Sequence, residues 1–236
     1  MIDIGKADFF IDVPGLPRRE FERYSSNLFD IWDQYIEETL KLPDYSVSLE
    51  IEEGSIKGAG KVAVVLSALY FGIGNYGDFI SGLQAIRGQV SYLGTKLIEN
   101  AVKPFEGEDV KTTSRNSGAT LSQLHGLFQK VQSGKMSPDQ AMVEAQRILG
   151  DEADSSPEFM DALENGLVRV PKNPSQISLL GESDLWIGEA PVSGDRKPRQ
   201  SPAHIPVIPS DQYRIVIWRE SKRKKKNVKV TKVKKK

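Results

Sequence analysis

The sequence predicts an α+β protein in which helices dominate, and three observations lead to this class. Long stretches place apolar residues at spacings of three and four, as amphipathic helices do. Shorter stretches alternate apolar and polar residues, as half-buried strands do. Of the 236 residues, 39% are hydrophobic and 27% are charged, a balance that excludes a wholly disordered chain. We therefore expect a small sheet packed by several helices.

The N-terminal third contains the clearest alternation and the clearest helical stripe. We expect a strand over residues 7–13, closed by Pro14 and Gly15. A helix should fill the stretch between Pro17 and Pro43, because proline suits a first helical turn and stops a helix that has already formed. A half-buried strand should follow over residues 46–52. The stripe of the helix comprises Phe21, Tyr24, Leu28, Ile31, Trp32, Tyr35, Ile36 and Leu40.

A glycine-rich segment from Lys61 to Leu97 predicts a long central helix, or two helices bent near residues 72–77. Its first half is almost continuously apolar, and its second half has helical spacing. Glycine inside a helix costs up to about 1 kcal/mol relative to alanine, so several of them need a packing reason. Small side chains allow two helices to approach closely. The expected helix-packing seam recurs every seven residues: Gly60, Ser67, Gly74, Ser81, Gly88 and Thr95.

The remaining chain predicts a loop over 103–118 and then three short helices, over 120–132, 138–149 and 157–167. Ser137 followed by Pro138 is a typical helix start. A proline-rich stretch comes next, and then a strand over 213–219; Val228, Val230 and Val233 form its hairpin partner or lie in a disordered tail. We expect four regions: an α+β unit (1–105), a helical unit (119–168), a proline-rich linker (169–211) and a basic strand or tail (212–236), extended or disordered.

The charge is strongly asymmetric although the formal net charge is zero. Residues 213–236 contain twelve Lys or Arg and one acid, which leaves 20 basic and 31 acidic residues in the rest of the chain. Such a tail attracts phosphates by counterion release, folds back on its own acidic body, or keeps the chain in solution. Aromatic residues beside the cations favour stacking on bases. The candidate anion-binding residues are Arg214, Trp218, Arg219, Lys222, Arg223, Lys224, Lys225, Lys226 and Lys229.

Catalytic and cofactor motifs are weak. Residues 72–77 match the spacing G-x-G-x-x-G, but the apolar run before them is long and no further β-α-β units follow, so helix packing explains the glycines better. The chain has no cysteine, and its only histidines are His125 and His204. We expect no catalytic residue, no metal site and no cofactor. Whether the protein is an enzyme stays uncertain, and a non-enzymatic role is favoured.

Two functional hypotheses follow. The favoured one is a bacterial, cytoplasmic adaptor or assembly protein that self-associates through the helix-packing seam, or packs a partner helix there. Its basic tail would bind an anionic partner, nucleic acid before anionic lipid. The alternative is a membrane-perturbing effector that inserts residues 62–83, a stretch long enough to span about 30 Å of hydrocarbon. Asp78 within this stretch is costly in a bilayer.

Overall fold

The computed structural model describes residues 1–13, 15–75, 78–105, 111–171 and 212–233. Within these ranges six strands form one antiparallel sheet in the order β4-β1-β3-β2-β5-β6. The predicted α+β class with a helical majority is confirmed. The strands are β1 (Ile2–Ile11), β2 (Ser46–Glu52), β3 (Ile56–Val64), β4 (Thr112–Ser117), β5 (Gln212–Arg219) and β6 (Asn227–Val233).

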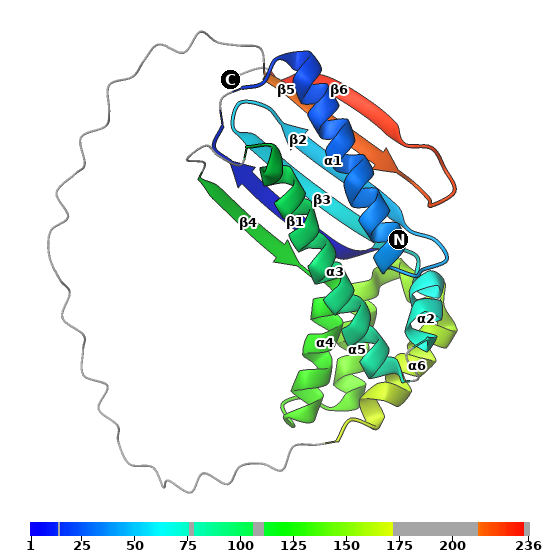
Figure 1. Ribbon diagram of the computed structural model, residues 1–236. Coiled ribbons are helices and arrows are strands. Elements are labelled where there is room, and N and C mark those ends of the chain that lie inside the picture. The colour runs from blue at the N-terminus through cyan, green and yellow to red at the C-terminus, as the bar shows by residue number, and fades with distance from the viewer. Residues whose placement is uncertain (14, 76–77, 106–110, 172–211, 234–236) are drawn as a thin grey trace, which may run out of the picture.

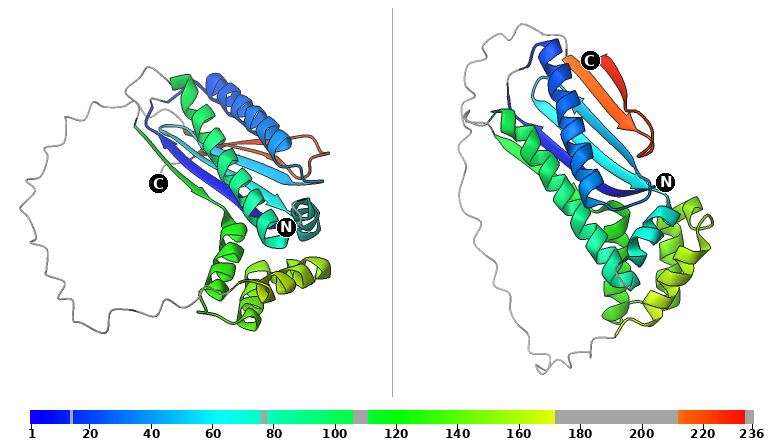
Figure 2. Two further views of the ribbon diagram at one scale, coloured as in Figure 1. Left: turned by 60° about the horizontal axis from the view of Figure 1, so that its bottom comes forward. Right: turned by 45° about the vertical axis from the view of Figure 1, so that its right-hand side comes forward.

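Two long helices cover one face of this sheet, and the other helices gather at one end of it (Figure 1). The long helices are α1 (Arg18–Thr39) and α3 (Phe79–Val102), and they contact each other as well as the sheet. Figure 2 shows both on the same side of the strands, with no described helix on the opposite face. The shorter helices are α2 (Leu66–Gly74), α4 (Ala119–Gln132), α5 (Pro138–Leu149) and α6 (Pro157–Val168).

The first four strands have the connectivity of a split β-α-β arrangement. The chain runs β1-α1-β2-β3-α3-β4 with the short α2 between β3 and α3, and β3 lies between β1 and β2 in the sheet. This is the β-α-β-β-α-β order that leaves both long helices on one face of an antiparallel sheet. The C-terminal hairpin β5–β6 then extends the sheet beyond β2, so residues at the two ends of the chain contribute to one sheet.

Close packing between the helices and the sheet depends on glycine in β3. A Cβ atom on Gly60 would lie 2.4 Å from Leu97 and 2.8 Å from the ring of Trp32. A Cβ atom on Gly58 would meet the ring of Phe9 at 2.0 Å. Both glycines therefore provide the room in which large buried side chains from α1, α3 and β1 pack against the strand.

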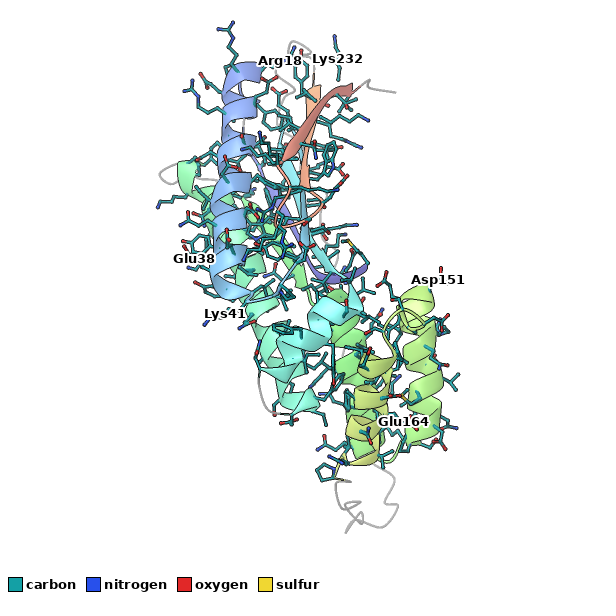
Figure 3. The ribbon with its side chains drawn as sticks, turned by 90° about the vertical axis from the view of Figure 1, so that its right-hand side faces the viewer. Arg18, Glu38, Lys41, Asp151, Glu164 and Lys232 are labelled. Atoms are coloured by element: carbon teal, nitrogen blue, oxygen red, sulfur yellow. The ribbon has the colours of Figure 1, made fainter. Side chains whose placement is uncertain are left out.

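The shorter helices share a core with α3. The ring of Phe79 in α3 lies 6.3 Å from that of Phe128 in α4 and 5.2 Å from that of Phe159 in α6. The predicted start of α5 is confirmed, because Ser137 and Gln140 form a reciprocal capping box. Figure 3 places Asp151 and Glu164 of this helical end away from Arg18 and Lys232, which lie at the opposite end of the molecule.

Of the two expectations for the segment from Lys61, two helices that separate near residues 72–77 are confirmed, but the expected helix start at Lys61 was wrong. Residues 56–64 form β3, which pairs with β1 on one side and β2 on the other. The apolar residues at the end of this segment are compatible with a buried strand as well as with a helix. They form a strand because β3 pairs with β1 and β2. A helix begins only at Leu66 and ends at Gly74, and Asp78 then caps α3 by accepting hydrogen bonds from the backbone N–H groups of Ile80 and Ser81.

Two further predictions have clear outcomes. The expected loop over 103–118 contains β4, an edge strand of six exposed residues that pairs with β1. The expected hairpin partner of the 213–219 strand is confirmed as β6. The segment 172–211, which includes most of the expected linker and His204, lies outside the described residues, as do residues 76–77 of the glycine motif and Lys234–Lys236.

Candidate nucleic-acid interface

The predicted basic residues lie on an ordered hairpin rather than on an extended tail. Strand β5 pairs with β2 in the register Trp218 to Ser48 and Arg214 to Glu52. Strand β6 pairs in turn with β5 and forms an exposed edge of the sheet. The basic segment is thus a β-hairpin, and the pairing of β5 with β2 places the residues of this hairpin beside those of the N-terminal strands.

Three cations of the hairpin contact an acidic face of α1. Arg219 donates to Asp33 at 2.5 Å, and Lys226 pairs with Asp30 at 2.5 Å. Lys222 lies 3.3 Å from Glu37. The three acids recur at spacings of three and four and therefore share one side of the helix. Part of the basic segment is thus engaged by its own acidic body, one of the alternatives left open by the sequence.

The contact of Arg219 is the most buried of the three ion pairs. Its side chain is 12% exposed and that of Asp33 is 19% exposed. Burial raises the pKa of Asp33, and the guanidinium opposes this shift. Arg219 also donates to the Tyr45 hydroxyl at 3.2 Å, and burial raises the pKa of Tyr45 to about 12. The phenol is therefore neutral at physiological pH, and Arg219 serves to anchor the hairpin.

Asp44 fixes the turn that joins β5 to β6. Its Oδ1 accepts hydrogen bonds from the Ser221 hydroxyl at 2.9 Å, from the Lys222 backbone N–H at 2.8 Å and from the Tyr45 backbone N–H at 2.9 Å. Partial burial works to raise the pKa of Asp44, but these hydrogen bonds outweigh it and hold the pKa below its ordinary value. The turn that carries the lysine run is therefore held to the body by a charged acceptor.

The face of the sheet opposite α1 and α3 carries most of the other charged side chains of the strands. Strand register aligns Lys6, Lys61, Ser48 and Trp218 in one row across four neighbouring strands. All four side chains are exposed or half-buried. Because side chains two residues apart along a strand share a face, Phe10 and Lys57 belong to this same uncovered face. We call it the open face.

A shallow depression of about 580 Å³ lies on the open face. Ala59 is the small residue in its middle, between Asp8 of β1 and Glu50 of β2. Arg115 and Phe10 contribute to its rim. The depression therefore combines an aromatic ring with charges of both signs.

Several acids of the open face are paired with its cations. Arg214 pairs with Glu52 and lies 3.3 Å from Glu50, and Lys6 lies 3.1 Å from Asp8. Among the described residues, three cations of the open face make no ion pair, namely Lys57, Arg115 and Lys229. In the hairpin turn, Arg223 and Lys225 likewise make none, and Lys224 pairs with Glu220. Five cations are thus available to an external anion.

The sequence missed the contribution of the N-terminal strands to this face. Lys57 and Lys61 lie on β3, for which the sequence predicted no strand, and Arg115 lies on β4, within the stretch expected to be a loop. The available signal was the spacing of Lys57 and Lys61, which lie an even number of residues apart in an otherwise apolar and glycine-containing run and therefore fit one exposed face of a strand.

The predicted helix-packing seam is not continuous. Gly60 lies on β3, Ser67 and Gly74 on α2, and the other three residues on α3. The chain turns between α2 and α3, and all members except Gly60 are exposed. A Cβ atom on Gly74 or Gly88 would meet nothing within 4 Å, so neither glycine makes room for another helix of the same chain. Self-association through the exposed members stays a prediction.

Residues 62–83 do not form the single helix that the membrane-insertion alternative requires. Residues 62–83 are divided among β3, α2 and the start of α3. In the part of the chain that the structure describes, no helix has both the length and the apolar character needed to cross a bilayer. Within the same ranges, no three His, Asp or Glu side chains gather in a group that could hold a metal ion. His125 contacts Arg87 and Gln84.

Comparisons with protein-family models, with curated proteins and with solved structures find no match to this chain.

Proposed function

We propose that the protein is a binding module that holds single-stranded nucleic acid across the open face of its sheet. The observation that supports this most strongly is the register that aligns Lys6, Lys61 and Trp218 on one uncovered face. Proteins that bind single strands combine a cationic surface for the backbone with aromatic rings on which bases stack. The open face has both components, and the hairpin turn adds Arg223 and Lys225 at its margin.

An extended strand fits this face better than a single nucleotide. Phe10 and Trp218 are three strands apart and lie two side-chain rows apart along the strands. With strands about 4.8 Å apart and a rise of about 3.3 Å per residue, the two rings are separated by roughly 20 Å. A ligand that stacks on both must therefore span several nucleotides, with its phosphates near the lysines between the rings.

The cations paired with α1 have a different role in this proposal. Arg219, Lys222 and Lys226 are engaged by Asp33, Glu37 and Asp30 on the helix side of the hairpin. They hold the hairpin against the body, which keeps Trp218 in its row. The cations without an ion pair, together with Lys61, supply the attraction to phosphate.

The test is the salt dependence of binding to a fluorescent oligouridylate and an oligothymidylate of about 12 nucleotides. Fluorescence anisotropy at salt concentrations between about 50 and 200 mM gives the slope of log affinity against log salt, near −0.7 for each phosphate neutralised on a single strand. Neutralising two open-face lysines that make no ion pair, in Lys57→Gln/Lys229→Gln, should make this slope shallower by about 1.4.

The matched control removes two lysines from the helical end of the molecule, Lys130→Gln/Lys135→Gln. This variant has the same net charge as the open-face variant and should retain nearly the whole slope. Equal losses in the two variants would show that binding follows total charge and would refute the open face as the site. Binding to anionic lipid vesicles without binding to either oligonucleotide would refute the proposed ligand.

A further inference from the structure

A second depression, of about 510 Å³, lies around the edge of the sheet from the open face. It is bounded by the first half of α3, by β4 and by the start of α4, and these elements are seen together in Figure 1. Two arginines, Arg87 and Arg115, line it together with hydroxyl and carboxamide side chains. No carboxylate is among its lining residues. The depression is therefore polar and positively charged.

Two glycines shape this depression. A Cβ atom on Gly88 would meet nothing within 4 Å, so the glycine leaves free space on the surface of α3. At Gly118 the situation is the opposite, because a Cβ atom would lie 2.5 Å from the Ser122 hydroxyl and 3.4 Å from Cγ of Arg87. The backbone at Gly118 thus approaches both polar side chains closely and keeps them at the same wall of the depression.

Arg87 is positioned without being neutralised. Its Nη1 lies 3.3 Å from Nδ1 of His125. A guanidinium only donates hydrogen bonds, so Nδ1 is the acceptor in this contact and the imidazole is neutral. Burial, with the charge of Arg87, lowers the pKa of His125 and favours this state. Since Arg87 has no carboxylate partner among the described residues, its remaining donors are available.

We propose that this depression binds a phosphomonoester group. A guanidinium presents paired donors that match the oxygens of phosphate, and the lack of carboxylates in the lining removes competition for them. Hydroxyl groups and the Asn116 carboxamide supply further donors. Arg115 lines both this depression and the one on the open face. The group bound here is therefore the terminal phosphate of a strand held on the open face, or the phosphate of a free nucleotide.

If the phosphate belongs to a nucleic-acid strand held on the open face, the inference rests on the proposed function. If it belongs to a free nucleotide, the inference is independent of that function. The experiment has two arms for this reason. In the first, anisotropy compares oligothymidylates that carry a 5′-phosphate, a 3′-phosphate or hydroxyls at both ends. In the second, isothermal titration calorimetry measures the binding of inorganic phosphate and of adenosine monophosphate.

The test variant is Gly88→Leu, which fills the depression without changing the charge. The wild-type protein should bind one of the two phosphorylated oligonucleotides roughly tenfold more tightly than the hydroxyl form, as expected for a phosphate held by a guanidinium. Gly88→Leu should abolish that difference and leave the affinity for the hydroxyl form unchanged. Arg87→Gln should likewise abolish the difference. The matched control is Gly126→Leu on α4, where a Cβ atom also has free space and the residue does not line the depression.

The outcomes separate the two proposals. Phosphate or nucleotide binding that Gly88→Leu abolishes, without oligonucleotide binding, supports this site and refutes the open face as a strand-binding surface. Oligonucleotide binding with no dependence on a terminal phosphate, and no calorimetric signal, overturns the inference and leaves the proposed function intact. A phosphate effect that persists in Gly88→Leu and Arg87→Gln also overturns it, because the group is then bound elsewhere. Circular dichroism checks that Gly88→Leu melts no lower than the wild type.

Discussion

Alanine at two glycines of the predicted seam should change stability in opposite directions. At Gly60 the new Cβ atom would lie 2.4 Å from Cδ2 of Leu97 and 2.8 Å from Cη2 of Trp32. The indole cannot move away freely, because its Nε1 donates to the Leu93 carbonyl at 3.0 Å. Overpacking of this kind costs about 1–3 kcal/mol. Replacing glycine in a strand recovers only about 0.5–1 kcal/mol of backbone entropy, so Gly60→Ala should destabilise the protein.

Gly88→Ala should have the opposite effect. Its Cβ atom would meet nothing within 4 Å, and the residue lies inside α3. Helix propensity then decides, and alanine is favoured over glycine by up to about 1 kcal/mol. Equilibrium urea unfolding, followed by circular dichroism, gives both changes from the shift of the midpoint at unchanged slope. Two variants that shift in the same direction would refute the packing of β3 against α1 and α3.

Three other perturbations test the anchoring of the hairpin and the helical end. Since the pKa of Asp44 is lowered in the folded state from its ordinary value of 3.8, its charge stabilises the fold above that pH and the benefit disappears as the pH falls through the folded pKa. The difference in unfolding free energy between the wild type and Asp44→Asn should therefore shrink between about pH 5 and pH 3. A double-mutant cycle on Arg219 and Asp33, with Gln and Asn substitutions, should give a coupling free energy of about 0.5–3 kcal/mol in urea unfolding, and additivity would contradict the ion pair. Ser137→Ala should lose about 1 kcal/mol in thermal unfolding, because the backbone N–H of Gln140 loses its acceptor.

Local signals in the sequence were sufficient for most helices and for the strands that alternate. The stripe around Trp32 predicted α1, and Ser137 with Pro138 predicted the start of α5. Val47, Leu49 and Ile51 predicted the buried face of β2. The stripe and the alternation each reflect one buried face, and the cap reflects the unpaired N–H groups of the helix's own first turn, so all three signals are local in the sequence.

Segments determined by distant pairing were not predictable in this way. β3 is buried between two strands and packed by two helices, so its glycines serve ring packing rather than a helix seam. β4 is an exposed edge strand of polar residues, without any apolar pattern. The sequence therefore predicted only the part of the candidate site that lies on the C-terminal hairpin, including Trp218. It did not predict Lys61, which joins the row of Trp218 only because β2 lies between β3 and β5.

The most direct test of the central claim is to map where a single strand touches the protein. The wild-type chain is irradiated with an oligouridylate that contains photoreactive 4-thiouridine, and the cross-linked peptides are identified by mass spectrometry. Binding across the open face predicts cross-links at Trp218 on β5 and at Phe10 on β1, both suppressed by high salt. Cross-links confined to the helical end formed by α4, α5 and α6, or to the hairpin turn alone, would contradict it.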